Sequence, residues 1–203
     1  MLGCLGREVT MRIGDVLFFA ANLRFADLNL GDSTSLVEAF KARVEGFYLS
    51  PARKLVDGDD AFAAGVICVA LIDFIARYSS GKDMVRDRFT SWLEDNIAEF
   101  KDKDPLKPSG TLAGRFYEDF RNGLVHEGRI KNLGQFSKSF PELLLLIDEG
   151  MICNPGELIQ KTTEAVNRYL DLVIKDRSQF EKLQRRLKTD FEAEIKASAA
   201  PGT

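Results

Sequence analysis

The sequence AFAAGVICVALIDFIARYSS, residues 61–80, is the most informative segment of the chain about its fold. Almost every residue in it is apolar, and its main charges are Asp73 and Arg77. A helix with so narrow a polar face is typical of the buried centre of a helical bundle. We interpret Cys68, within the stretch, as a small buried hydrophobic residue. The sequence therefore predicts a central helix that ends at Gly81.

Amphipathic segments on both sides of this stretch supply the partners that a bundle needs. Residues 33–55 and 82–100 each repeat apolar side chains at helical spacing. We expect Ser33 or Thr34 to cap the first of these helices, and Pro51 to end or kink it. The apolar positions of the two helices are Leu36, Val37, Phe40, Val44, Phe47, Met84, Val85, Phe89, Trp92, Leu93 and Ile97.

The second half of the chain begins with a loop and a further helix. Residues 101–110 are charged and contain proline and glycine, which is typical of a loop. Residues 111–128 repeat the helical pattern, and Gly128 is a suitable C-terminal stop. The apolar positions of this fourth helix are Leu112, Phe116, Phe120, Leu124 and Val125.

The pattern then changes at residues 142–153, where two short apolar runs flank Glu149 and Gly150. We interpret these runs as a small β-hairpin. Asn154, followed by Pro155, has the residue types of a capped helix start and predicts that a helix follows at once. A last helix, expected near the C-terminus, is highly charged.

These segments predict an all-α protein, a bundle of about five or six helices with one small β-hairpin insertion. We divide the chain into an N-terminal segment (1–32), a helical domain (33–175) and a charged C-terminal helix and tail (176–203). Of its 203 residues, 45% are hydrophobic and 29% are charged, which is sufficient apolar material for one core.

Net charge and cysteine content narrow the classes of function. The net charge is −3, so an RNA partner would need a local basic surface. Cys4, Cys68 and Cys153 lack paired spacing and a neighbouring histidine, which argues against zinc and against a disulfide framework. We therefore expect no cofactor and a reducing, cytoplasmic location. We also expect no targeting signal and no membrane association, because no apolar run reaches the ~18 residues that span a bilayer.

The strongest candidate for chemistry is FRNGLVHEGR, residues 120–129, which contains the one histidine of the chain. On an α-helix, Arg121, Asn122 and His126 would lie at about 0°, 100° and 140° around the axis. Asn122 and His126 would then be one turn apart, with Arg121 beside them. The three side chains can therefore line one rim of a pocket.

This trio suits the cleavage of RNA. A histidine can remove a proton from a ribose 2′-hydroxyl, which then attacks the neighbouring phosphorus. An arginine can hold that phosphate through paired hydrogen bonds and stabilise the growing negative charge. An amide can orient the imidazole or bind the substrate. No metal is required for this chemistry. The spacing by itself also fits a histidine that merely ends a helix.

The longer stretch YEDFRNGLVHEGRI, residues 117–130, resembles the signature helix of the HEPN superfamily (higher eukaryotes and prokaryotes nucleotide-binding domains). That signature is an arginine, a polar residue, three further residues and a histidine. Arg121, Asn122 and His126 fill these places. The order of helices is similar too, since a buried second helix and an amphipathic third helix precede the motif. The resemblance covers residues 33–175.

The resemblance implies an all-helical fold that usually forms a homodimer. In active members, both copies of the motif meet at the dimer interface and form one metal-independent ribonuclease site. It thus implies catalytic roles for Arg121, Asn122 and His126 in an endoribonuclease of toxin or phage-defence type, with an antitoxin as a further partner. The alternatives are a non-catalytic member that binds nucleotide, RNA or a protein, and a structural protein assembled through its final helix.

Four residues near the motif have both a functional and a structural interpretation. One of Asp73 and Arg77 could orient Arg121 or His126; alternatively, the two could pair with each other one turn apart or make a polar contact to a neighbouring helix. Tyr117 could stack on a base or pack in the core. Glu127 could act beside the histidine or stay solvated at the helix end. On the residues alone, the structural interpretation is the more common one in each case.

Basic residues around the motif predict where RNA would lie. In a two-fold dimer, copies of Arg115, Arg129 and Lys131 would converge on one groove and contact RNA. Acidic neighbours would leave that groove only mildly positive. Residues 175–188 also carry an excess of positive charge, which we interpret as a solvated or helix-pairing face rather than an RNA-binding stripe, because acidic residues intersperse it.

Overall fold

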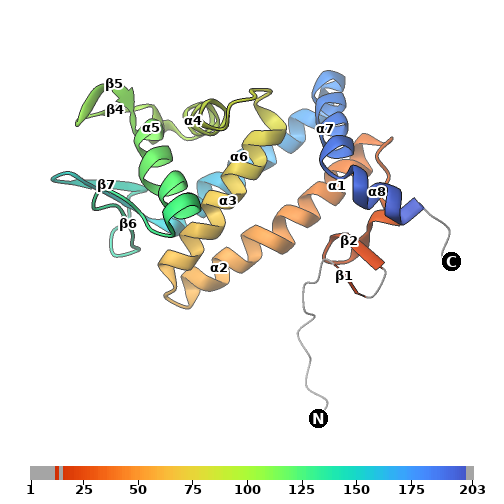
Figure 1. Ribbon diagram of the computed structural model, residues 1–203, viewed down its shortest axis with the longest axis horizontal. Helices are drawn as coiled ribbons and strands as arrows, with labels where there is room; N and C mark the ends of the chain where they lie inside the picture. Colours follow the sequence, from red (N-terminus) through yellow and green to blue (C-terminus); the bar gives the residue numbers. More distant parts are fainter. Residues whose placement is uncertain (1–11, 14–15, 200–203) are drawn as a thin grey trace, which may run out of the picture.

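The apolar stretch forms the central helix of the structure, a computed structural model that describes residues 12–13 and 16–199. This helix, α3 (Ala61–Ser79), contacts α2 (Ser50–Asp57), α4 (Val85–Asn96), α6 (Pro155–Lys175) and α7 (Arg177–Asp190). Figure 1 shows α3 running through the middle of the molecule. The prediction of a buried central helix is therefore confirmed, because α3 is surrounded by the other helices.

By length and composition α3 could also cross a membrane, but half of its apolar window is buried inside the fold. Gly81 has a φ of +67° just after the helix, as expected for a glycine that ends one. Within the helix, a Cβ at Gly65 would lie 2.3 Å from the Phe136 ring, so only glycine allows that ring to pack here. These contacts are those of a core helix.

The helix before α3 continues through Pro51, so it does not end there as one of the two expectations had it. It consists of α1 (Ser33–Val44), a π-helical turn η2 (Glu45–Leu49) and α2. In the π turn the Ser50 N–H bonds to Glu45 O, so the widened helix accommodates the proline that follows. The N-terminal cap is Asp32, which accepts from Ser35 N at 2.7 Å, and not Ser33 or Thr34.

The predicted loop at residues 101–110 contains a hairpin, so that prediction is wrong in part. After α4 and a 3-10 turn η3 (Ala98–Lys101), strands β4 (Lys103–Asp104) and β5 (Lys107–Thr111) pair in antiparallel fashion. The buried Asp104 carboxylate closes the turn by accepting from Leu106 N at 3.0 Å. A short hairpin closed by one aspartate has no alternating pattern, so its sequence resembles that of a loop.

The second hairpin is confirmed and has one more strand than expected. Strands β7 (Leu144–Ile147) and β8 (Gly150–Cys153) pair around a turn at Asp148, whose φ is +51°. Strand β6 (Gln135–Phe136) adds to β8 in parallel. Asn154 caps α6 as predicted, since its side chain accepts from Gly156 N at 2.9 Å.

Elements near the two ends of the described chain contact each other. In the N-terminal segment, strands form a small sheet, and the charged C-terminal segment continues from α7 into α8 (Glu192–Ala199). Phe19, Phe25 and Phe191 join the two ends through ring contacts of 5.5 to 5.6 Å between centroids. The remaining N-terminal elements are β1 (Arg12–Ile13), β2 (Val16–Ala20), β3 (Leu23–Arg24) and the 3-10 turn η1 (Phe25–Asp27).

The protein is therefore mostly helical, with three small sheets in the part of the chain that the structure describes. Figure 1 shows the strands at the periphery of the helices. Cys68 and Cys153 are buried and free, whereas Cys4 lies outside the described residues. The fold is that of a helical bundle, in which one helix close to α3 carries the motif.

Candidate functional site

The motif lies in a helical segment that is wound more widely than an α-helix. After α5 (Leu112–Phe116) come two π-helical turns, η4 (Tyr117–Arg121) and η5 (Gly123–Glu127). Gly128 ends the segment with a φ of +67°, as predicted. In a π-helix the hydrogen bonds join residues five apart, the spacing of Arg121 and His126. The α-helical angles expected from the sequence therefore do not apply, and these two residues come closer to one side of the helix.

Arg121 is held by a carboxylate on the central helix. Its Nε and Nη2 donate to Asp73 Oδ2 at 3.1 and 2.6 Å. The other oxygen, Asp73 Oδ1, lies 3.5 Å from Nη2 of Arg88 on α4, so one carboxylate joins two arginines. The Arg121 side chain is 12% exposed, which leaves its outer edge at the surface. Asp73 thus contacts a motif residue on a neighbouring helix, as both the functional and the structural interpretation of Asp73 allow.

Asn122 joins the motif to α4 instead of to the histidine. Its Nδ2 donates to Glu118 Oε2 at 3.2 Å, and its Oδ1 accepts from Arg121 Nη1 at 3.4 Å. Glu118 in turn pairs with Arg86 at 3.2 Å. The amide is therefore engaged by its neighbours, and the expected hydrogen bond that would orient the imidazole is not formed.

His126 stands at the surface with its imidazole free. Its side chain is exposed, and no hydrogen bond or ion pair reaches it from residues 12–13 or 16–199. The neighbouring Val125 is 58% exposed, so this end of the motif helix is open to solvent. An imidazole without a protein partner can exchange protons with a bound substrate.

The other predicted supporting residues take the structural role in each case. Arg77 donates to Asp190 on α7 at 2.6 and 2.7 Å and makes no pair with Asp73. Tyr117 is 8% exposed and packs in the core, with the Arg121 guanidinium 5.8 Å from its ring centre. Glu127 pairs with basic residues at the helix end, which lowers the pKa of its carboxyl group.

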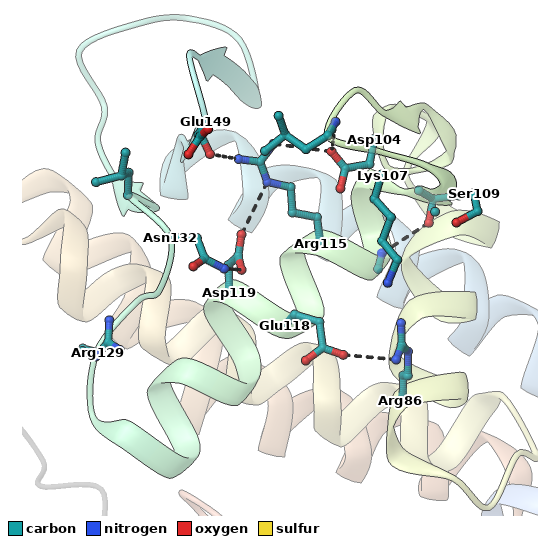
Figure 2. A pocket seen from close by; sticks show the side chains of 15 residues that line it. Arg86, Asp104, Lys107, Ser109, Arg115, Glu118, Asp119, Arg129, Asn132 and Glu149 are labelled. Carbon is teal, nitrogen blue, oxygen red and sulfur yellow. Dashed lines mark hydrogen bonds and ion pairs between the residues drawn. The ribbon is translucent and has the colours of Figure 1, made fainter.

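Arg115, one of the basic residues expected on RNA, is buried, which contradicts that expectation. Figure 2 shows its guanidinium between Asp104, Asp119 and the main chain of Glu149. It lies 3.5 Å from Asp104 Oδ1 and 3.4 Å from Asp119 Oδ2, and it donates to the Glu149 carbonyl. Arg115 therefore connects the motif helix to the first hairpin through Asp104 and to the second hairpin through Glu149.

The other two basic residues lie at the surface but are already paired. Arg129 and Lys131 both bind Glu127, at 2.8 and 2.7 Å. The Glu127 carboxylate therefore offsets part of the positive charge that they were expected to offer RNA. Lys131 also forms part of the loop that folds back on the motif helix, since its N–H bonds to Asp119 O at 2.9 Å.

A cleft lies beside the motif helix, and its lining does not include the motif residues. It measures about 840 Å³ and is bounded by the first hairpin, the outer face of the motif helix and residues 129–133. Figure 2 shows Arg86 and Glu118 facing each other at its rim. The basic and acidic residues that line it are equal in number. They are Arg86, Lys107, Arg115 and Arg129 against Asp104, Glu118, Asp119 and Glu149.

Sequence reasoning missed Arg88, the second arginine on Asp73. Its side chain is 9% exposed, and its Nη1 also donates to Asp83 O at 3.2 Å. The signal was present, because Arg88 lies three residues after Val85 and four before Trp92, on the apolar face of α4. A charged residue on a core-facing position needs a buried partner.

Comparison of the chain with protein-family models, with curated proteins and with solved structures found no match. The function of the chain therefore has to be inferred from its own residues. The site that these residues form is a surface-exposed imidazole beside an arginine that the Asp73 carboxylate holds in place.

Proposed function

We propose that this chain is a metal-independent endoribonuclease of HEPN type. The observation that carries the proposal is the contrast between the two motif residues five apart on one helix. Arg121 is fixed by Asp73, whereas His126 is exposed and unpaired. A fixed cation and a free imidazole are what phosphate binding and proton transfer require.

The proposed reaction uses both residues directly. His126 removes the proton of a ribose 2′-hydroxyl, whose oxygen attacks the adjacent phosphorus. A bond forms between O2′ and phosphorus, the bond from phosphorus to the 5′-oxygen breaks, and the leaving oxygen takes a proton. Arg121 has donors beyond the two that Asp73 accepts, since a guanidinium carries five N–H groups. These donors stabilise the charge on the phosphate oxygens.

We further propose that the site is shared between two copies of the chain. The resemblance of the motif helix to HEPN domains, which usually pair, supports this arrangement, and the exposed His126 and Val125 leave this end of the motif helix open to a second copy. A second copy related by a two-fold axis would bring its own His126 to protonate the leaving oxygen. Specific activity should then rise with protein concentration as dimers form, and light scattering measures the dimer directly.

The proposal includes a cellular setting. Buried free thiols at Cys68 and Cys153 are in keeping with a reducing compartment, so we propose a cytoplasmic location. An RNA-cleaving protein there would act as a toxin or in phage defence, held in check by a protein partner such as an antitoxin.

Cleavage of RNA by the purified chain tests the proposal. We expect wild type to cleave single-stranded RNA in the presence of EDTA, and both His126→Ala and Arg121→Ala to lose at least about 100-fold in rate, the usual scale for a proton-transfer group. Arg177→Ala is a matched control, because Arg177 is an exposed arginine on α7 with a side chain 75% accessible. Equal rates in wild type, the motif variants and the control would refute the catalytic roles.

A non-catalytic RNA-binding or protein-binding member is the second candidate. It is favoured by one observation, that Asp73 already pairs with Arg121 and thus reduces the charge it offers a phosphate. In that case wild type would bind labelled RNA or a partner without cleaving it, and His126→Ala would bind equally well.

A further inference from the structure

A small hollow lined by cations lies between the end of α3, the turn before α4 and the outer face of α7. It measures about 220 Å³, and among its lining residues five are basic and one, Asp83, is acidic. The basic residues are Arg77, Lys82, Lys182, Arg185 and Arg186. The large cleft beside the motif helix has no such excess, because its basic and acidic residues balance.

The positive charge of this hollow is only partly neutralised by the protein. Asp190 pairs with Arg77 at 2.6 Å and lies 3.5 Å from Nε of Arg186. That Nε is buried and has no hydrogen-bond acceptor. Lys182 and Arg185 are exposed, and no carboxylate in the described part of the chain pairs with either side chain. On a chain with a net charge of −3, this is a concentrated positive site.

Three of the basic residues lie on the same face of α7. Lys182, Arg185 and Arg186 are three and four residues apart, so they share one face of α7. Arg77 approaches that face from α3 and is tied to it through Asp190. Several arginine and lysine donors around a hollow of this size suit the oxygens of a single phosphate group.

Two residues, Asp73 and Arg88, link the hollow to the motif. Asp73, which holds Arg121, lies four residues before Arg77 on the same face of α3, about 6 Å along the helix axis. Arg88 connects the two sites a second time, since it pairs with Asp73 and donates to the main chain of Asp83. Two contacts thus link the lining of the hollow to Asp73, the residue that holds Arg121.

We propose that this hollow is a backbone subsite for single-stranded RNA, binding a phosphodiester group a short distance along the strand from the motif. The identity of the ligand rests on the proposed ribonuclease function, whereas the anion preference rests on the charges alone. Contacts to phosphate position a strand without reading its sequence. The subsite would therefore hold RNA across Arg121 and His126 whatever its bases.

The test measures RNA binding separately from cleavage. Fluorescence anisotropy of a labelled single-stranded RNA is recorded with the full chain carrying His126→Ala, so that the RNA stays intact. Into this background we place Lys182→Glu with Arg185→Glu. The matched control is Arg177→Glu with Lys188→Glu, two exposed residues of α7 that do not line the hollow, with the same change in net charge.

We expect the Lys182→Glu, Arg185→Glu variant to raise the Kd for RNA at least about 10-fold at low salt. The Arg177→Glu, Lys188→Glu control should change this Kd by less than about 3-fold. The slope of log K against log salt should fall by about 0.7 for each phosphate group that the variant no longer binds. Equal weakening by both pairs would mean general charge attraction and would overturn the subsite. Circular dichroism confirms that each variant is folded.

The outcomes also separate this inference from the ribonuclease proposal. RNA that binds through Lys182 and Arg185 but is never cleaved by wild type would refute the catalysis and support the subsite. If wild type cleaves RNA but the changes at Lys182 and Arg185 do not alter the Kd for RNA, the subsite is refuted and the ribonuclease proposal is supported. A wild type that binds no RNA refutes both.

Discussion

Asp73 is the residue on which the motif depends, although it lies far from the motif in the sequence. Its Oδ2 accepts from Arg121 and its Oδ1 lies near Arg88, and both arginine side chains are largely buried. A buried arginine without a carboxylate carries an uncompensated charge, which is strongly unfavourable. Asp73 therefore acts through Arg121 as a positioning residue, and its removal should affect both stability and function.

We expect Asp73→Asn to lower the free energy of unfolding by about 2 kcal/mol, because two arginines lose their charged partner while a neutral acceptor remains. Urea unfolding monitored by circular dichroism measures this loss. In the cleavage assay the same variant should raise the KM for RNA more than it lowers kcat, since a displaced Arg121 binds phosphate less well.

Asp171→Asn is the control for this change, because Asp171 is an exposed aspartate on α6. It should alter the unfolding free energy by no more than about 0.5 kcal/mol. If both variants behave alike, the Asp73 carboxylate does not hold the two arginines in solution.

At the scale of the element, the motif helix is shaped by a loop that packs against it. Residues 129–131 return along the helix, and a Cβ at Gly123 would lie 2.4 Å from Arg129 O. Gly123 lies between Arg121 and His126, at the start of the second π-helical turn. Because glycine has no side chain, the loop can approach the helix at the start of this second π-helical turn.

Two glycines of this segment make a matched pair. We expect Gly123→Ala to destabilise the fold by about 1–3 kcal/mol, because its methyl group meets main-chain atoms that must move. Gly114→Ala should instead be neutral or stabilising by up to about 1 kcal/mol, since its Cβ would lie 3.8 Å from the nearest atom and alanine favours the helix. Thermal and urea unfolding of both variants measure the difference, and equal effects would contradict the close approach at Gly123.

At the scale of the whole molecule, one ion pair ties the C-terminal α7 to the central helix. Arg77 donates two hydrogen bonds to Asp190, 113 residues further along the chain. The hydrogen bond from Arg77 lowers the pKa of the Asp190 carboxyl group. A carboxyl group with a lowered pKa in the folded state adds stability above its unfolded pKa, and this stability is lost as pH falls through the folded pKa.

We therefore expect acid to weaken the attachment of α7. An unfolded aspartate titrates near about 3.9, so the loss begins below about pH 4. Between pH 6 and pH 3, wild type should lose on the order of 1 kcal/mol more unfolding free energy than Asp190→Asn, allowing for solvent screening of the exposed Arg77. Urea titrations at each pH measure the difference.

The comparison with Asp190→Asn is needed because other groups titrate in the opposite direction. Burial raises the pKa of Asp119, so protonation of that group favours the folded state as pH falls. A wild-type curve alone would combine both effects. If wild type and Asp190→Asn lose stability in parallel, the pair with Arg77 does not contribute to acid sensitivity.

Features that depend on neighbouring residues could be predicted from the sequence. The apolar run at residues 61–80 identified the central helix, and Asn154 and Gly128 marked a helix start and a helix end. Capping and periodicity act within one or two turns, so they are visible in a short window of sequence. The motif residues were found in the same way, as a pattern of types within six positions.

The contacts of each polar side chain and the winding of the motif helix could not be predicted, because they depend on how the helices pack. Arg121 binds Asp73 across 48 positions, and Arg77 turns away from Asp73 to a residue on α7. Arg115 is buried against Asp104. The basic residues of α7 line a hollow together with Arg77 from α3. Such pairings depend on which helices pack together, because a side chain binds the nearest group of opposite charge wherever that group lies in the chain.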